Sequence, residues 1–567
     1  MNILGVHDGK DAGVALVADG RVLFAANEER YSRQKMHFGF PHQSLQRLFA
    51  YTGFTPKDID HVTVGFEAMV EKSGEAYDFE AEPRLHQKVY SVLTRTLGEV
   101  MNSKVATYGA LQVLKLLSQN KAQLRQNLDA AGISAPAHFF NHHLTHAASA
   151  YYTCGRDEAL IVTSDGGGDA ISGGVYVARG GRMENKSTFS KLNSAGIFWE
   201  IITQLCGFNP ERHGGKITGL AAYADGEQAY PILRRLYGTK ARTGGMENLR
   251  KLAFRDAFAD ARSQVGNLSI EEVSSGAQRI LEEAFVETVR SAYERFRIPH
   301  VVLAGGTFAN VRLNQKILEV PGIESVYIHP HMGDGGMAVG SALLLAGQRG
   351  ETRPHWLTDV YWGDDWSEAS MRAALQQSSG VRWRRLEEPA EAIATAMAQK
   401  QVVGVFHGRM EYGPRALGHR SILAEPTDTT MMDWLNKRLC RTEFMPFAPI
   451  IVEEEAPHYF QNFAASVYPS RFMTICVQCT PLCREKAPGV VHRDGTARPQ
   501  SVRSDTDPYT YRALRAYQRQ TGLPLAINTS FNKHEEPIVG SPADAISELK
   551  RNAVDVLFLE NYEVVVA

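Results

Sequence analysis

The fold is decided by two stretches of sequence, Ile3-Leu-Gly-Val-His-Asp-Gly-Lys-Asp-Ala-Gly-Val-Ala-Leu-Val-Ala-Asp-Gly20 and Leu160-Ile-Val-Thr-Ser-Asp-Gly-Gly-Gly-Asp-Ala-Ile-Ser-Gly-Gly-Val-Tyr-Val-Ala-Arg-Gly-Gly181. In each, an apolar strand is followed by a Gly/Asp-rich turn, a second apolar strand and a two-residue hairpin turn. The repetition predicts an internal duplication. We therefore expect an α/β domain with two lobes and a cleft between them.

The rest of the chain is expected to form helices and short strands around these copies. Residues 84–131 have helical periodicity and predict a helical hairpin inserted over the cleft. Short buried strands are predicted at 301–304 and 326–329, each followed by glycines. Composition then shifts toward Gly, Pro and Trp. We predict a first domain over 1–350, a linker over 351–389 and a second α/β domain over 390–567.

Composition narrows the class of protein. The chain has 567 residues with 61 Lys and Arg against 63 Asp and Glu, a net charge of -2, which disfavours a nucleic-acid partner. No apolar run is long enough to cross a membrane, and the N-terminal sequence lacks the pattern of a secretory signal. We expect a cytoplasmic protein without a nucleic-acid or membrane partner.

Six cysteines are too few for a disulfide framework. Cys476, Cys479 and Cys483 are closely spaced but lack a second pair of zinc ligands, and His492 completes no common pattern. Cys476 follows an apolar run, 472–475, that is predicted as a strand. We expect buried free thiols here.

The sharpest local signal is His142-His-Leu-Thr-His146, which opens a helix of small residues. His142 and His146 are four residues apart, so on a helix they share one face and can bind one metal ion. Asp165 and Asp334, which follow strands beside glycine runs, are the carboxylates expected to complete the site. Such a set suits Fe(II), Mn(II) or Zn(II). The alternative is a group of surface histidines at a helix start.

Two further patterns point to phosphate. Glycines at strand ends can present backbone N–H groups to a phosphate, and they recur at 166–168, 214–215, 305–306 and 333–336. In the second domain, arginines lie among Gly, Pro and apolar residues between 408 and 441, and a strand at 524–532 ends in Asn and Ser. Arginine forks with Asn and Ser donors suit a compact polyanion. Ordinary surface charge is the alternative.

These residues also resemble a known family. The motifs that carry the resemblance are Glu28-Glu-Arg-Tyr-Ser-Arg33, His142-x-x-x-His146, Gly408-Arg-Met-Glu-Tyr-Gly-Pro-Arg-Ala-Leu-Gly418, Asp494-Gly-Thr-Ala-Arg-Pro-Gln500 and Asn528-Thr-Ser-Phe-Asn532. Together they are similar to the NodU/CmcH-type O-carbamoyltransferases over nearly the whole chain. The resemblance implies an N-terminal two-lobed actin-like (ASKHA) domain followed by a C-terminal YrdC-like α/β domain.

The resemblance also implies a two-step reaction. Carbamoyl phosphate and ATP, with Mg²⁺, would give carbamoyladenylate in the YrdC-like domain. The carbamoyl group would then pass to a hydroxyl of a small-molecule acceptor, a secondary metabolite or sugar, at an iron-type metal site in the actin-like domain. Transfer of carbamoyl or threonylcarbamoyl to a macromolecule is an alternative, as is a nucleotide-regulated binding protein that has lost the transfer chemistry. A monomer and a homodimer are both compatible with this resemblance.

Residue roles follow from the same resemblance. The implied metal ligands are His142, His146, Asp165 and Asp334. The implied phosphate and nucleotide contacts are Arg415, Lys437, Arg441, Arg498, Asn528 and Ser530, with Gly305, Gly306 and Asn310 lining the adenylate in the first domain. Many relatives have His-Asp where this chain has Lys10-Asp11. The base for the acceptor hydroxyl is therefore Lys10 if burial lowers its pKa, or His7 if its loop turns inward.

Overall fold

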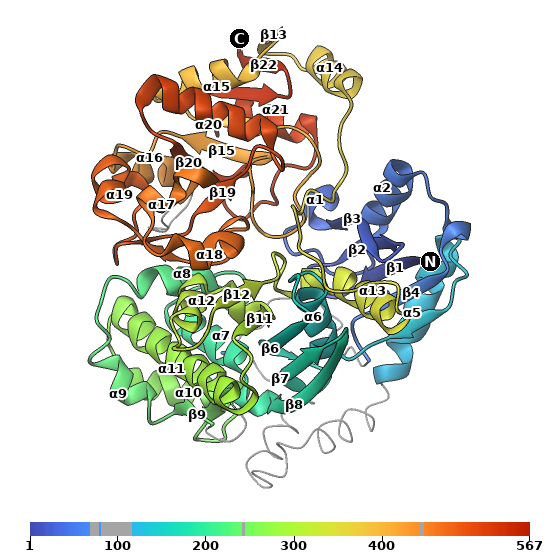
Figure 1. Ribbon diagram of the computed structural model, residues 1–567, viewed down its shortest axis with the longest axis vertical. Coiled ribbons are helices and arrows are strands. Elements are labelled where there is room, and N and C mark those ends of the chain that lie inside the picture. Colours follow the sequence, from blue (N-terminus) through green and yellow to red (C-terminus); the bar gives the residue numbers. More distant parts are fainter. Residues whose placement is uncertain (68–78, 81–115, 241–243, 441–446) are drawn as a thin grey trace. The chain divides into compact units, whose positions relative to one another are not determined.

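A computed structural model describes residues 1–67, 79–80, 116–240, 244–440 and 447–567 (Figure 1). The chain forms two compact units. Unit 1 comprises residues 1–21, 38–40 and 55–356, and unit 2 comprises residues 22–37, 41–54 and 357–567. Both units are mixed α/β structures, as the sequence predicts.

The first sheet of unit 1 is built on the first of the two repeated stretches. β1 (Asn2–His7) pairs antiparallel with β2 (Gly13–Ala18) and parallel with β4 (His61–Val64), which pairs parallel with β5 (Ala137–Phe139). β2 is buried along its whole length because both of its faces are covered. These strands therefore stand in the order β2-β1-β4-β5.

The second sheet repeats this arrangement. β6 (Glu158–Gly168) pairs antiparallel with β7 (Ile171–Arg179) and parallel with β11 (His300–Ala304), which pairs parallel with β12 (Ser325–Ile328). β8 (Arg182–Ser190) extends the sheet beyond β7. The order β7-β6-β11-β12 matches β2-β1-β4-β5 in sequence order and strand direction. The predicted duplication is confirmed.

Both predicted hairpin turns are present and explain why glycine ends each of them. Asp19 and Gly20 have φ of 50° and 72°, and Gly180 and Gly181 have φ of 58° and 82°. Two successive positive φ values define a type I′ turn, whose twist matches that of the flanking strands. Glycine meets this requirement without steric cost.

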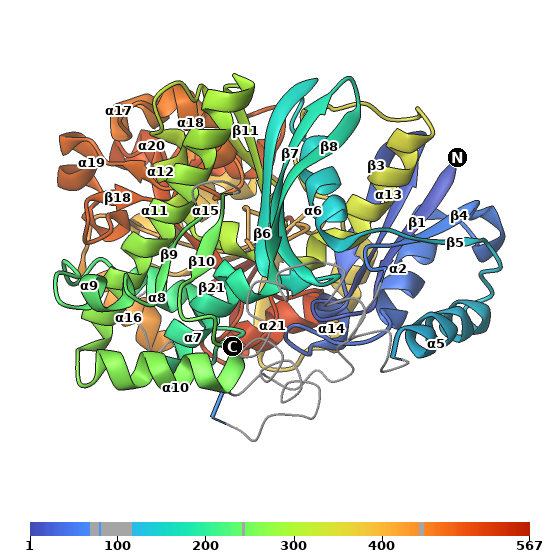
Figure 2. The same cartoon turned by 90° about the horizontal axis from the view of Figure 1, so that it is seen from below.

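Two helices lie between the sheets of unit 1 (Figure 2). α13 (Met337–Gln348) packs on β1, β2 and β4 of the first sheet. α6 (His142–Tyr151) packs on β6, β7 and β11 of the second sheet, and α6 and α13 pack against each other. Almost every residue of both helices is buried. Small side chains allow this close approach, since a Cβ on Gly340 of α13 would lie 2.4 Å from the backbone oxygen of Thr145 in α6.

The remaining helices of unit 1 form its outer layer. Their bounds are α7 (Ala195–Leu205), α8 (Gly214–Leu220), α9 (Ala229–Leu233), α10 (Phe254–Val265), α11 (Ile270–Phe296) and α12 (Val311–Leu318), with a small hairpin of β9 (Tyr237–Thr239) and β10 (Met246–Asn248). Most of the predicted helical insertion lies outside the described residues, but its end forms α5 (Leu116–Ala130). Among the described residues, no helix is long and apolar enough to span a membrane.

Unit 2 is organised by an eight-stranded sheet with the order β13-β22-β21-β14-β15-β20-β16-β19. Its strands are β13 (Val381–Arg385), β14 (Val403–Phe406), β15 (Arg420–Ala424), β16 (Ala448–Val452), β19 (Gln500–Val502), β20 (Leu525–Ser530), β21 (Val556–Leu559) and β22 (Tyr562–Val566). α15 (Pro389–Ala398) and α20 (Pro508–Thr521) pack together over this sheet and bury its main apolar core. α21 (Pro542–Lys550) packs on β14 and β21.

Two segments from the predicted linker and first domain belong to unit 2. The stretch 351–389 contains α14 (Glu368–Gln377) and the edge strand β13, so the sheet begins before residue 390. Most of β3 (Arg21–Asn27), all of α1 (Glu29–Ser32) and all of α2 (His42–Thr52) also belong to this unit.

The Glu28–Arg33 motif forms hydrogen bonds that hold residues 22–37 and 41–54 within unit 2. Arg30 Nη2 donates to the carbonyl of Gly413 at 2.9 Å, and the Tyr31 hydroxyl donates to Asp364 Oδ1 at 2.8 Å. Glu28 accepts from the backbone N–H groups of Gln43 and Ser44 at the start of α2. The segment is therefore held by hydrogen bonds that are buried or partly buried, where such bonds are costly to lose.

The cysteine region corrects one strand prediction. Residues 472–475 form a turn rather than a strand, because Met473 has φ of 55°, which is incompatible with an extended chain. β17 begins only at Val477 and ends at Gln478. Among the described residues, no cysteine takes part in a cluster of three metal-ligating side chains. Cys476, Cys479 and Cys483 are buried and form no disulfide with one another.

Candidate functional site

The four predicted metal ligands meet in unit 1. His142 and His146 lie on one face of α6, whose start is fixed by Asn141, since its side chain accepts from the backbone N–H of Leu144. Asp165 comes from β6 and Asp334 from the turn that precedes α13. One ligand atom from each of the four side chains lies within 4.8 Å of all the others.

The distances within this cluster are short. Asp165 Oδ2 lies 2.6 Å from His142 Nε2 and 3.2 Å from His146 Nε2. Asp334 Oδ1 lies 3.7 Å and 3.4 Å from the same two nitrogens. Ligands about 2.0–2.2 Å from one tetrahedral ion are separated by roughly 3.3–3.6 Å, so three of these spacings suit a single ion, whereas His142 and Asp165 are at hydrogen-bond distance and would separate on binding it.

The local backbone explains how the side chains reach each other. The β6–β7 register shifts between Ser164 and Gly168, and such bulges re-aim side chains beside functional sites. A Cβ on Gly168 would lie only 2.3 Å from the ring of His142, so glycine makes room for the imidazole. The backbone N–H of His142 donates to Asp169 Oδ2 at 2.7 Å, which holds the start of α6 against the bulge.

The chemistry of the donor set fits a divalent transition metal. His146 Nε2 and Asp165 Oδ1 are buried and have no hydrogen-bond partner. Buried polar atoms are normally satisfied, so unpaired ones in a cluster of ligand types indicate a ligand of another kind. Two imidazoles with two carboxylates suit Fe(II), Mn(II) or Zn(II) rather than Mg²⁺.

In the absence of a metal ion, the electrostatics of this cluster favour a positive charge on His146 and negative charges on the two carboxylates. Burial alone would lower the pKa of His146, but the nearby carboxylates of Asp165 and Asp334 raise it to about 9. Burial would raise the pKa of Asp334, yet the nearby His146 and the charge of His142 lower it to about 2. Without an ion, His146 is therefore a buried imidazolium between two carboxylates at neutral pH.

This protonation predicts that metal binding strengthens as the pH rises. His146 must lose its proton before Nε2 can ligate, so the apparent affinity should rise about tenfold per pH unit from pH 6 to 8 and level off near pH 9. Calorimetry with Zn(II) in two buffers of different ionisation enthalpy would count the protons released. The difference between wild type and His142→Ala should be about one proton per ion, and a count of zero contradicts the prediction.

His143 lies beside the cluster, although the i, i+4 spacing that predicts His142 and His146 does not include it. Its Nε2 lies 3.5 Å from Asp165 Oδ1 and donates to the carbonyl of Ile171 at 3.2 Å. Burial lowers its pKa to about 3, so the ring is neutral. The adjacent pair of histidines is the only signal in the sequence that could have pointed to it. Asp169 was likewise missed, although it ends the same glycine run as Asp165.

The two candidate bases have different environments. His7 is fully buried, and its Nε2 donates to the carbonyl of Lys10 at 2.8 Å, which leaves a buried, unpartnered Nδ1. Its ring stacks on Phe66, which in turn contacts the ring of His142. Burial lowers the pKa of His7 although the charge of Asp334 opposes this, so the imidazole is neutral and able to accept a proton.

Lys10 and Asp11 lie on the same turn but have ionic partners. Lys10 Nζ is 3.0 Å from Glu211 Oε2 and forms an ion pair with it. Asp11 has φ of 61°, and its Oδ2 lies 3.5 Å from Nε2 of the buried His331. The loop thus turns His7 inward and pairs Lys10 with Glu211.

The three predicted adenylate contacts lie at the end of β11. Gly305 has φ of 102° and packs so closely that a Cβ would lie 2.2 Å from the carbonyl oxygen of Ser164, whereas the space beside Gly306 is open. Asn310 caps α12, and its amide exchanges hydrogen bonds with Gln278 at 2.7 and 3.3 Å. Its side chain is therefore already partnered.

A second group of predicted residues meets in unit 2. Arg415 and Arg498 are half-buried, and the Nε of each is buried without a hydrogen-bond partner. Burial, followed by the charge of Arg498, lowers the pKa of Arg415 to about 9. Burial also lowers the pKa of Arg498, which Cys476 opposes. Two neighbouring, half-buried cations of this kind have the charge and the donors that suit an anion, so Arg415 and Arg498 form a candidate anion site.

Asn528 joins the segments that carry these arginines. Its Nδ2 donates to the carbonyl of Ala416 at 3.2 Å and to Gln500 Oε1 at 2.6 Å, and its Oδ1 is buried without a partner. Ser530 lies two residues further on β20, opposite Ser421. Asn528 thus connects the residue after Arg415 with a residue close to Arg498.

The last two predicted nucleotide contacts are not brought into this group. Lys437 is exposed in the last turn of α16 (Thr430–Arg438), and nothing in the described structure links it to Arg415 or Arg498. Arg441 lies outside the described residues. The roles of these two residues remain predictions from the resemblance.

The fold and these two groups define a two-unit α/β protein with a candidate metal centre in one unit and a candidate anion site in the other. Two family models cover the chain: the carbamoyltransferase N-terminus matches residues 2–343 and the carbamoyltransferase C-terminus matches residues 394–565. The chain belongs to the carbamoyltransferase family, and is accordingly a transferase.

Relatives with curated names support this assignment over the full length. Nodulation protein NolNO of Sinorhizobium fredii is 30% identical over 564 residues, covering 98% of this chain and 78% of that protein. Nodulation protein U of the same organism is 27% identical over 577 residues, covering 96% of each. Among solved structures, the ROK hexokinase of Thermus thermophilus aligns with 61% of this chain and 98% of its own at 15% identity and a TM-score of 0.28.

Proposed function

We propose that the protein is an ATP-dependent O-carbamoyltransferase that acts on a hydroxyl group of a small molecule. In the first half-reaction, water releases phosphate from carbamoyl phosphate, the carbamate oxygen attacks the α-phosphorus of ATP, and pyrophosphate leaves. In the second, the acceptor hydroxyl attacks the carbamoyl carbon of carbamoyladenylate, its proton passes to a base, and AMP leaves. Unit 2 would carry out the first half-reaction and unit 1 the second.

The observation that carries this proposal is the unpaired arginine pair of unit 2. Arg415 and Arg498 repel each other and have lost most of their hydration without gaining a counter-ion among the described residues. A protein retains such an arrangement where a ligand supplies the missing negative charge. Bidentate guanidinium groups match phosphate oxygens in charge and geometry, so both substrates of the first half-reaction suit them.

In unit 1, His142, His146, Asp165 and Asp334 would hold a divalent transition metal, with Fe(II) as our first candidate. When bound, the ion would supply Lewis acidity to a carbonyl oxygen. Asp169 fixes the position of α6 through the backbone of His142, and so fixes the two imidazoles. The bulge at Asp165 and the turn at Asp334 bring the carboxylates to the same point.

His7 is the residue that we propose as the general base. Since Nε2–H is held by the carbonyl of Lys10, the lone pair on Nδ1 is free to take the acceptor proton. His7→Gln should therefore lower acceptor carbamoylation by about 10²–10⁴-fold without changing acceptor-independent pyrophosphate release. Lys10→Met removes only a partly exposed ion pair worth ~0.2–1 kcal/mol and should stay within about fivefold of wild type. If Lys10→Met is the inactive variant, the assignments are reversed.

The proposal as a whole is tested without an acceptor. The protein is incubated with ¹⁴C-carbamoyl phosphate, ATP and Mg²⁺, and pyrophosphate and labelled carbamoyladenylate are measured. Formation of both supports the first half-reaction, and candidate alcohols can then be supplied. ATP binding with neither product would contradict the proposal and favour a nucleotide-regulated binding protein.

A further inference from the structure

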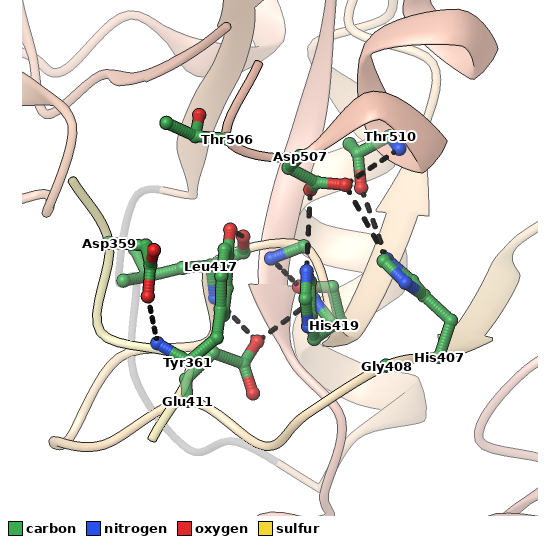
Figure 3. Close-up of polar contacts among 12 residues, drawn as sticks. Asp359, Tyr361, His407, Gly408, Glu411, Leu417, His419, Thr506, Asp507 and Thr510 are labelled. Atoms are coloured by element: carbon green, nitrogen blue, oxygen red, sulfur yellow. Dashed lines mark hydrogen bonds and ion pairs between the residues drawn. The ribbon is translucent and has the colours of Figure 1, made fainter. Parts of the chain in front are cut away.

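A second cluster of ligand-type side chains lies in unit 2 and has no part in the proposed reaction. It consists of His407, His419 and Asp507, all buried (Figure 3). His407 follows β14, His419 precedes β15, and Asp507 is the N-cap of α20. The backbone N–H of His407 donates to the carbonyl of His419 at 3.1 Å, so the two histidines close the base of the loop 408–418.

The three side chains face one another but form no hydrogen bond with one another. His407 Nε2 lies 3.8 Å from Asp507 Oδ1, and His419 Nε2 lies 3.8 Å from Asp507 Oδ2. Both distances exceed the length of a hydrogen bond. One ligand atom of each residue nevertheless lies within 4.8 Å of the other two. Three atoms at these separations can surround one ion after a shift of a few tenths of an ångström.

A hydrogen bond outside the cluster orients the ring of His419 toward its centre, while His407 Nε2 lies 3.4 Å from the hydroxyl of Thr510 as well as facing Asp507. His419 Nδ1 lies 2.7 Å from the carbonyl oxygen of Arg409, which can only accept, so Nδ1 carries the proton. With Nδ1 held by this carbonyl, Nε2 is the ring nitrogen that faces Asp507. Asp507 Oδ2 is buried and has no hydrogen-bond partner. A lone pair that faces an unpaired carboxylate oxygen at this distance favours a cation between them.

The environment selects the type of ion. The rings of His407 and His419 lie with centroids 4.0 Å apart, and His407 also stacks on Tyr509. Tyr361 stacks on His419 with ring centroids 3.5 Å apart. Two imidazoles and one carboxylate match Zn(II) or a similar borderline ion, and not Mg²⁺.

We infer that His407, His419 and Asp507 form a second metal site, for Zn(II) or a comparable divalent transition ion. An ion there would join both ends of the loop 408–418 to the start of α20. Because that loop carries Arg415, the ion would hold one of the two unpaired arginines in place. This inference does not depend on the proposed reaction, since it concerns only binding of an ion by buried ligands.

Zinc stoichiometry tests the inference directly. Protein stripped with a chelator is equilibrated with Zn(II), and bound zinc is measured after removal of the excess. His142→Ala, which disables the cluster of unit 1, should still retain one zinc per chain, and His142→Ala with Asp507→Asn should retain none. Asn still accepts from the N–H of Thr510, as Asp507 does at 3.0 Å, so the cap of α20 is preserved. Asp505→Asn, an exposed neighbour, is the matched control and should retain one.

Two results would overturn the site. The first is that His142→Ala binds no zinc, and the second is that Asp507→Asn in that background binds as much as the Asp505→Asn control. His419→Gln provides an independent variant if Asp507→Asn folds poorly.

With Co(II) in place of Zn(II), the d–d absorbance of a histidine-ligated ion should appear in His142→Ala and disappear with Asp507→Asn. Hydrogen exchange in 408–418 should slow about tenfold or more on zinc addition, and unchanged exchange would overturn the role in the loop.

Discussion

Replacing His142 by alanine is expected to abolish carbamoylation of the acceptor while carbamoyladenylate formation continues. His142 Nε2 lies 2.6 Å from Asp165 Oδ2 at the centre of the unit 1 cluster, so its loss removes one of four ligands. A bound metal ion contributes several kcal/mol to charge stabilisation, and each 1.36 kcal/mol is a factor of ten in rate. We therefore expect transfer to fall by at least about 10³-fold.

The two half-reactions are measured separately in this experiment. Pyrophosphate release without an acceptor reports on unit 2, and the labelled product with an acceptor reports on unit 1. His138→Ala is a suitable control, since His138 lies four residues earlier on β5 and contacts His61 rather than the cluster. If His142→Ala loses its metal but carbamoylates the acceptor at the wild-type rate, the cluster has no role in transfer.

Replacing both Arg415 and Arg498 by glutamine should instead impair carbamoyladenylate formation, the half-reaction that His142→Ala leaves intact. Charge-assisted hydrogen bonds contribute about 1.5–3 kcal/mol each, so pyrophosphate release should fall by about 10²–10⁴-fold. The free protein should become slightly more stable, by ~1 kcal/mol or less, because two half-buried cations no longer repel each other. A loss of activity together with a small rise in Tm separates a binding role from a structural one.

An exposed arginine provides the control for this pair. Arg519 on α20 forms a surface ion pair with Glu391, and Arg519→Gln should change neither pyrophosphate release nor Tm appreciably. The double variant is measured by thermal unfolding and by acceptor-independent pyrophosphate release. Wild-type release from the double variant would show that phosphate binds elsewhere in unit 2.

Much of the fold was predictable because its determinants are local. The duplication is visible in the sequence because each copy has two apolar strands that end in a type I′ turn, at Asp19-Gly20 and at Gly180-Gly181. Turns and strands of this kind are determined by the residues of short segments. His142 and His146 were predicted as a pair because a helix places i and i+4 on one face. The family motifs of unit 2 likewise identified Arg415 and Arg498.

What the tertiary structure alone decided concerns residues that are distant in sequence. His7 turns inward and Lys10 pairs with Glu211 because of packing around the loop, which no local pattern encodes. The segments 22–37 and 41–54 join unit 2 through buried hydrogen bonds that the chain order conceals. His407, His419 and Asp507 meet only because β14, β15 and α20 are neighbours in the folded unit. Local sequence sets the geometry of each element, whereas the burial of many weak contacts sets which elements meet.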